Sequence, residues 1–283
     1  MPWKLPRWMT SRSEEVVPIE ESPPPKRIGL ALSGGAVRGA AHIGVLEVLE
    51  RAGIRPDLVA GVSAGSVVGS LYCAGYSTTQ LRGLAANLQW RRLARICTPR
   101  LSLFDTTRME DYLNELLEGR SFDQLNIPFV AVAVDIVTCT EVVLREGPLA
   151  RAVRASCALP ALFTPIEWGD KLLIDGGVMN NLPVQVLRDL GADYVIAVDV
   201  MWASGHNRRP RNIFEMSLQS AYAALRTAYR ESHDADCLIS PKIPDLSLTD
   251  FSDVDELLAR GKEAAEGALD QVRADLNLAG AAP

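Results

Sequence analysis

One stretch of the sequence decides the fold: Leu58-Val-Ala-Gly-Val-Ser-Ala-Gly-Ser-Val-Val-Gly-Ser-Leu-Tyr-Cys73. Its apolar start predicts a short strand over 58–61, and the small residues over 64–73 predict a helix. Between them lies a G-x-S-x-G pattern around Ser63, in which a glycine two positions to either side lets the chain turn sharply. Such a turn exposes the serine hydroxyl at a helix N-terminus, where negative charge is favoured. Ser63 is therefore either a nucleophile or, less specifically, the N-cap of a helix.

On both sides of this stretch, short apolar runs alternate with amphipathic segments. Strands that alternate with helices need crossover connections, which give a parallel sheet covered by helices on both faces. The pattern predicts an α/β fold of three layers, α/β/α, with a mainly parallel central sheet. Expected strands cover 28–32, 129–137, 141–144, 171–174, 194–200 and 238–240, and expected helices cover 40–52, 79–93, 107–117, 149–157, 183–190, 213–231 and 254–276.

The composition narrows the class of protein. The chain has 283 residues, 48% of them hydrophobic, which is enough for one large core. A formal net charge of -6 argues against a general affinity for nucleic acid. No apolar run reaches the roughly 18 residues that a membrane span needs. The five cysteines are scattered and include no CxxC pair, which disfavours a disulfide framework and a zinc site. We therefore expect a cytoplasmic protein without a bound metal.

The two ends of the chain differ from the rest. Residues 1–12 hold two tryptophans, three basic residues and no acid, and a proline-rich stretch follows. We interpret 1–26 as a tail and linker, 27–276 as a single folded domain, and 277–283 as a C-terminal tail. The basic start is either a disordered tail or a peripheral membrane anchor, because tryptophan and basic groups suit the headgroup layer.

A second glycine-rich segment, Ser33-Gly34-Gly35-Ala36-Val37-Arg38-Gly39, lies between the first strand and the first helix. Small residues in succession let backbone amides face an anionic ligand at a helix start. It could bind a nucleotide phosphate, although it matches neither the P-loop nor the dinucleotide pattern. It could also be a plain tight turn, or supply an oxyanion hole for Ser63 if the two strands are neighbours.

A third motif, Asp175-Gly176-Gly177, follows the expected strand 171–174. Asp-Gly turns are common, but an aspartate at the end of a strand also stands where α/β sheets place their sites. A Ser–His–Asp triad would need a histidine after the acid, and only His206 and His233 fit that order. His42 falls inside the first helix and is expected to be structural. A carboxylate could act as the base instead, but either burial has to raise its pKa above the usual value of about 3.9, or the oxyanion hole has to carry much of the catalysis.

Together these motifs resemble those of the patatin-like phospholipases, in particular their short bacterial members. The likeness covers about 27–200 well and the last 80 residues weakly. One departure is Ala36, where many members have a third glycine. The matching segments are LSGGAVRGAAHIGVL (32–46), GVSAGS (61–66), ASCALP (155–160) with FTP (163–165), and DGGVMNNLP (175–183).

The resemblance implies a serine acyl hydrolase that cleaves lipid or other esters through a Ser–Asp dyad, with no metal and no cofactor. An alternative from another class is a regulatory or adaptor protein that keeps the fold without catalysis. A phosphate- or nucleotide-binding module is disfavoured because the P-loop lysine is absent. The implied site residues are the nucleophile Ser63, the base Asp175, the oxyanion-hole residues Gly34, Gly35, Ala36 and Arg38, and the supporting glycines Gly39, Gly61, Gly65, Gly176 and Gly177.

Overall fold

The computed structural model describes residues 25–98, 101–201, 209–210, 216, 220, 234–243 and 253–278. Eight of its strands form one sheet, in the order β11-β10-β1-β2-β5-β9-β8 with β6 added beside β5, and three short strands form a second sheet, in the order β3-β4-β7. The strands are β1 (Ile28–Leu32), β2 (Leu58–Val62), β3 (Arg95–Ile96), β4 (Ser102–Asp105), β5 (Phe129–Asp135), β6 (Thr140–Leu144), β7 (Ala161–Phe163), β8 (Ile166–Trp168), β9 (Lys171–Asp175), β10 (Tyr194–Val198) and β11 (Cys237–Ile239).

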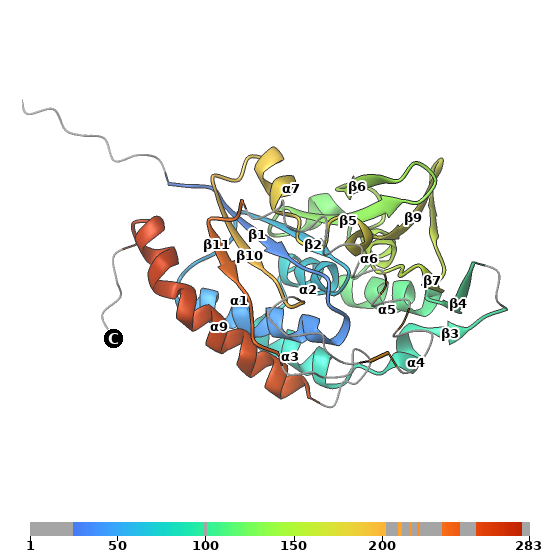
Figure 1. Ribbon diagram of the computed structural model, residues 1–283, viewed down its shortest axis with the longest axis horizontal. Helices are drawn as coiled ribbons and strands as arrows, with labels where there is room; N and C mark the ends of the chain where they lie inside the picture. Colours follow the sequence, from blue (N-terminus) through green and yellow to red (C-terminus); the bar gives the residue numbers. More distant parts are fainter. Residues whose placement is uncertain are drawn as a thin grey trace, which may run out of the picture.

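Helices cover both faces of the main sheet. Side chains alternate along β1, so that Leu30 and Leu32 join one hydrophobic cluster while Ala31 joins another. The helix α7 packs on the second cluster, and Figure 1 shows it on the opposite side of the sheet from α1, α3 and α9. The predicted three-layer α/β/α architecture is confirmed. The helices are α1 (Ala40–Arg51), α2 (Ala64–Cys73), α3 (Thr78–Ala86), α4 (Trp90–Leu93), α5 (Thr107–Leu117), α6 (Leu149–Ser156), α7 (Val184–Asp189) and α9 (Val254–Asp275), with short 3-10 turns η2 (Ala36–Gly39), η3 (Phe122–Gln124) and η4 (Gly176–Val178).

The strand directions bring the motif loops together. Strands β11, β10, β1, β2 and β5 are parallel to one another, as predicted. The flanking strands β6 and β9 run antiparallel to β5, and β8 runs antiparallel to β9. Since β1 and β2 are adjacent and Leu32 pairs with Gly61, the glycine-rich loop and the Ser63 turn leave the sheet at the same edge.

Helix α9 packs directly against α1, backbone to backbone. A Cβ atom on Gly44 of α1 would overlap the carbonyl oxygen of Leu258, and one on Gly261 of α9 would overlap the carbonyl oxygen of Ala41. Only glycine permits this approach at both positions. The C-terminal helix is therefore fixed to the helix that follows the glycine-rich loop.

Most predicted elements are confirmed to within one or two residues, but the expected helix 79–93 is wrong in its extent. It divides into α3 and α4, because the Asn87 side chain bonds the carbonyl of Gly83 and ends the first helix. The strands β3, β4, β7 and β8, of two to four residues each, are not among the elements that the sequence predicts. The predicted helix 213–231 lies almost wholly outside the described residues.

Candidate active site

Ser63 occupies the turn between β2 and α2 in a strained backbone conformation, with φ of 49° and ψ of -121°. A positive φ is unfavourable for a residue with a Cβ atom and persists only where the surroundings enforce it. The Ser63 carbonyl accepts hydrogen bonds from the Ser66 hydroxyl at 2.6 Å and from the Ser66 amide at 2.8 Å. The Ser63 amide donates to the Ser156 hydroxyl at 2.9 Å. Hydrogen bonds therefore hold both the amide and the carbonyl of Ser63 in place.

The glycines of the turn allow close packing. A Cβ atom on Gly61 would lie 2.6 Å from the Gly65 carbonyl oxygen, and one on Gly65 would overlap the carbonyl oxygen of Leu32. The start of α2 thus rests on the end of β1. This contact sets the glycine-rich loop beside Ser63.

The glycine-rich loop contacts Ser63 through Gly34, whose Cβ position would lie only 3.1 Å from the Ser63 Cβ. The Gly34 amide is already used, because it donates to the Asn181 carbonyl at 3.3 Å. Within the described residues, the amides of Gly35 and Ala36 have no hydrogen-bond partner. Ala36 adopts a φ of 50°, which explains why glycine is common at this position in the family it resembles. Gly35 and Ala36, rather than Gly34, are the donors that could face an anion.

His42, in α1, is hydrogen-bonded to the first residue of the same loop. Its Nε2 donates to the Ser33 carbonyl at 2.9 Å, and the ring is completely buried. Burial lowers the pKa of His42 to about 4, although the hydrogen bond to Ser33 opposes this, so the ring is neutral at pH 7. These contacts fit the structural role expected for His42.

Asp175 lies at the same height in the sheet as Ser63, on the other side of β5. Val132 of β5 pairs with Val62, the residue before Ser63, and the next residue, Ala133, pairs with Asp175. The sequence predicts Asp175 at the carboxyl edge of parallel strands, but β9 runs antiparallel to β5, so it is the pairing register that sets the position of Asp175. The registers place the acid at the same height as the serine, with β5 between their two strands.

The environment of Asp175 suits a base. The carboxylate is 2% exposed, and its Oδ1 accepts a hydrogen bond of 2.8 Å from the Gly177 amide. Its Oδ2 makes no hydrogen bond of normal length within the described residues. Burial raises the pKa of Asp175 to about 7, while the Ser63 hydroxyl and the Gly177 amide favour the charged form and limit the rise. A carboxylate of this pKa can take and return a proton near neutral pH.

Three further residues complete the site without having been assigned a role from the sequence. The Ser156 hydroxyl donates to the Val132 carbonyl at 2.6 Å and so joins the Ser63 turn to β5. The buried Asn181 links the loop after Asp175 to Gly34 through its backbone carbonyl and its side-chain amide. The third is Cys157. Burial, and to a smaller extent the charge of Asp175, raises the pKa of its thiol, so Cys157 remains protonated and is a poor nucleophile. The sequence points to these three residues only through their place in the family-like segments 155–160 and 175–183.

The remaining predicted residues lie around this centre. Arg38 is 3% exposed and lies in η2, where its amide donates to the carbonyl of Gly35, the N-cap of this turn, at 3.1 Å. His206, His233 and the segment 1–12 lie outside the described residues.

Among the residues that are described, no group of three or more His, Cys, Asp or Glu side chains is placed to hold a metal, and none of the helices is long and apolar enough to cross a bilayer. The supporting glycines pack closely, Gly39 against Ala64, Gly61 and Gly65 within the turn, Gly176 against Val132, and Gly177 beside Asp175 and Asn181.

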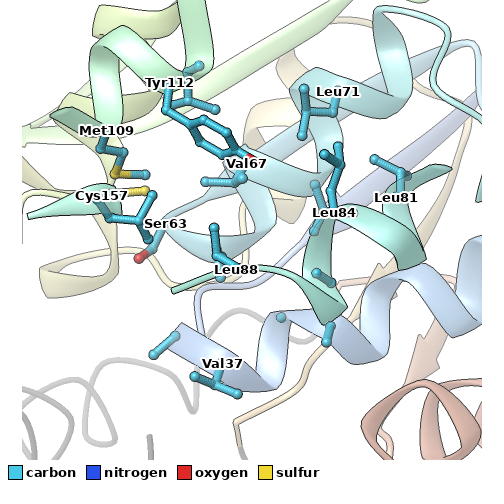
Figure 2. Close-up of a pocket in the computed structure, with 18 of the residues that line it drawn as sticks. Val37, Ser63, Val67, Leu71, Leu81, Leu84, Leu88, Met109, Tyr112 and Cys157 are labelled. Carbon is cyan, nitrogen blue, oxygen red and sulfur yellow. The ribbon is translucent and has the colours of Figure 1, made fainter. Parts of the chain in front are cut away.

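Ser63 opens into an apolar cavity of about 170 Å³. Figure 2 shows Met109 and Cys157 beside Ser63 at one end and Leu71 and Leu81 at the other. Apart from Ser63, the lining is almost wholly aliphatic or aromatic, and most of it comes from α1, α2, α3 and α5, with further residues from η2, α4, β7 and α9. The cavity could therefore hold an apolar group beside the serine.

The sequence of this chain is similar to that of known proteins. The family model described as patatin-like phospholipase matches residues 30–188. Neuropathy target esterase sws of Drosophila melanogaster is 33% identical over 207 residues, which cover 70% of this chain and 13% of that protein. An uncharacterized NTE family protein of Mycobacterium tuberculosis is 36% identical over 177 residues, covering 62% of this chain and 49% of that one. The chain therefore spans half or less of the length of these relatives.

Solved structures with a similar fold include VipD of Legionella pneumophila, with a TM-score of 0.51 and 14% identity over 88% of this chain and 67% of that one. The type III effector protein ExoU gives the same TM-score at 16% identity, over 88% of this chain and 54% of that one. At such identities the similarity shows the fold alone.

Proposed function

The chain belongs to the patatin-like phospholipase family, and from this premise we propose that it hydrolyses carboxylic ester bonds of lipids through a Ser63–Asp175 dyad. The observation that carries the proposal is the combination of a strained serine, a buried carboxylate of pKa about 7 and an apolar cavity that begins at that serine. A serine that only capped a helix would need neither the buried carboxylate nor the cavity beside it.

In the proposed reaction, ionised Asp175 accepts the Ser63 proton as Oγ attacks the ester carbonyl carbon. The carbonyl oxygen becomes an oxyanion, which the Gly35 and Ala36 amides stabilise, with the positive charge of Arg38 nearby. The tetrahedral intermediate collapses, the alcohol leaves with the proton from Asp175, and the acyl group stays on Ser63. Water then attacks the acyl-enzyme with Asp175 as base, and the acid is released as the serine is reprotonated.

The cavity suggests the part of the substrate that is bound. Its apolar walls suit an acyl chain, which would bury hydrocarbon at about 0.8 kcal/mol for each methylene. The polar remainder of the lipid would stay outside. We therefore propose a long-chain ester, of the phospholipase A, lysophospholipase or esterase type, as the substrate class.

A catalytically silent regulatory or adaptor protein is the alternative. It would have no use for a buried carboxylate with a raised pKa, because desolvating a charge lowers stability. The intact serine turn and glycine-rich loop also favour an enzyme.

A fluorophosphonate probe tests the nucleophile directly. We expect it to label the wild type, to label Asp175→Asn weakly or not at all, and to leave Ser63→Ala unlabelled. Ser70→Ala is the matched control, since Ser70 is a buried serine in α2, the helix that follows Ser63, and its hydroxyl donates to the Val67 carbonyl at 3.0 Å. Labelling of Ser63→Ala at the wild-type level would exclude Ser63 as the nucleophile, and a wild type that neither reacts nor cleaves a p-nitrophenyl ester would favour the adaptor.

A further inference from the structure

Two of the most exposed hydrophobic side chains of the structure lie on one hairpin. Ile96, on β3, is 83% exposed, and Leu101, directly before β4, is 66% exposed. Figure 1 shows β3 and β4 projecting from the body of the molecule, away from the main sheet. Single exposed apolar residues need no explanation, but two on the same projecting element form a small apolar tip.

The hairpin and its flanks are strongly basic. Residues 91–108 contain five arginines and one aspartate, an excess of four positive charges in a chain whose formal net charge is -6. The single acid, Asp105, is paired with Arg95 at 2.8 Å and lies 3.6 Å from Arg154. Arg91, Arg92 and Arg108 are exposed, and within the described residues none of them forms an ion pair. The surface around the apolar tip is therefore positive.

The same segment continues into the cavity that ends at Ser63. Leu93 and Ala94, just before β3, line the cavity, as do Thr106 after β4 and Phe163 of β7. Strand β7 pairs with β4, so the hairpin is fixed to one wall of the cavity. A long apolar molecule that leaves the hairpin surface meets apolar side chains along this wall.

We propose that this hairpin, with Arg91, Arg92 and Arg108 beside it, is the docking surface for an anionic lipid bilayer. Ile96 and Leu101 enter the boundary between headgroups and acyl chains, and the arginines contact lipid phosphates. The proposal rests on the proposed function, because a lipid substrate has to pass from a bilayer into the cavity. A second protein is a poorer occupant, since two projecting side chains fall far short of the roughly 800 Å² per partner of a stable protein interface.

Vesicle co-sedimentation of the full chain tests the surface, in a Ser63→Ala background so that no lipid is consumed. Vesicles contain phosphatidylcholine alone or with phosphatidylglycerol. We expect binding to the anionic vesicles that weakens as salt rises. Ile96→Ser with Leu101→Ser should weaken it at least about tenfold through the lost apolar contact. Arg91→Gln with Arg92→Gln should weaken it about 25-fold, at roughly fivefold for each arginine.

Two matched variants control for general effects. Leu278→Ser removes an exposed leucine that follows the carboxyl end of α9. Figure 1 shows this end of α9 on the opposite side of the molecule from the hairpin. Arg51→Gln with Arg260→Gln removes the same charge from α1 and α9. We expect both to bind vesicles like the parent, and all hairpin variants with an intact Ser63 to cleave a soluble short-chain ester normally.

The outcomes separate the two proposals. If hairpin variants bind like the controls, or if the parent does not bind anionic vesicles, the docking surface is wrong whatever the esterase assay shows. A parent that forms dimers in solution, which the hairpin substitutions abolish while vesicle binding is unaffected, would replace the bilayer by a second copy. Hairpin-dependent vesicle binding by a protein without esterase activity would support the surface and overturn the proposed function.

Discussion

Replacing Asp175 by asparagine should abolish activity and, at the same time, make the protein more stable at alkaline pH. The side chain is 2% exposed, and burial raises its pKa from 3.8 to about 7. A difference of about 3 pH units corresponds to about 4 kcal/mol, at 1.36 kcal/mol for each unit. This is the free energy that the folded protein loses by holding the carboxylate charged in a desolvated site.

The sign follows from which state binds the proton. Below about pH 4 the carboxyl is protonated in both states, and its contribution to stability is complete. Between about pH 4 and pH 7 only the folded state keeps the proton, so the free energy of unfolding of the wild type falls as pH rises. The asparagine side chain of the variant does not titrate, so the stability of Asp175→Asn relative to the wild type should increase by about 4 kcal/mol from pH 4 to pH 8.

Urea unfolding of both proteins at pH 4, 6 and 8 measures this difference. Asp135→Asn is a matched control on the neighbouring strand, because hydrogen bonds, above all from the Thr138 hydroxyl, lower the pKa of that buried aspartate. Its replacement should therefore destabilise the protein more at pH 8 than at pH 4. A difference between Asp175→Asn and the wild type that stays constant with pH would refute the assignment of a raised pKa to Asp175. In the wild type, kcat/KM should rise with pH to a plateau, with a midpoint near pH 7.

The remaining predictions concern the surroundings of the dyad and the tail. Ser156→Ala leaves the Ser63 amide without its partner, so we expect a loss of about 1–3 kcal/mol in urea unfolding and a fall in kcat larger than any change in KM. Gly35→Pro removes a proposed oxyanion donor and should lower kcat about 100- to 1000-fold in an esterase assay; a folded variant with near-normal kcat would place the oxyanion hole elsewhere. Because the pKa of buried His42 is about 4, acid should charge it only on unfolding, and the stability advantage of the wild type over His42→Gln should shrink by about 3 kcal/mol from pH 7 to pH 4, as unfolding at both pH values would show. Deleting residues 1–22 should weaken co-sedimentation with anionic vesicles but spare soluble ester turnover, and unchanged co-sedimentation would exclude an anchor there.

The local motifs could be predicted because their conformation depends on residues that are close together in the sequence. The Ser63 turn needs a glycine two positions to either side, and the structure shows both glycines in contacts that no side chain would permit. The strand and helix limits around it follow from runs of apolar residues long enough to show a period. The boundaries of the domain at 27–276 and a cytoplasmic location stay predictions.

The parts that depend on long-range pairing could not be predicted. The position of Asp175 depends on its pairing with Ala133, and antiparallel register is not encoded near either residue. The bond between Ser156 and the Ser63 amide joins residues 93 positions apart. The use of the Gly34 amide by Asn181 likewise appears only when the two loops meet, and it shifts the proposed anion donors to Gly35 and Ala36.

The packing of α9 on α1 has a consequence for shortened versions of the protein. The family match ends at residue 188, yet β10 and β11 extend the sheet beyond β1, and Gly261 lies against the backbone of α1. Helix α1 begins at Ala40, directly after the glycine-rich loop. By packing on α1, helix α9 therefore restricts the position of this loop, although α9 lies outside the matched region. A protease cut between residue 188 and α9 would therefore be tolerated only while the two fragments stay together. Separating them would uncover the apolar faces of α1 and β1 and release the loop that flanks the serine.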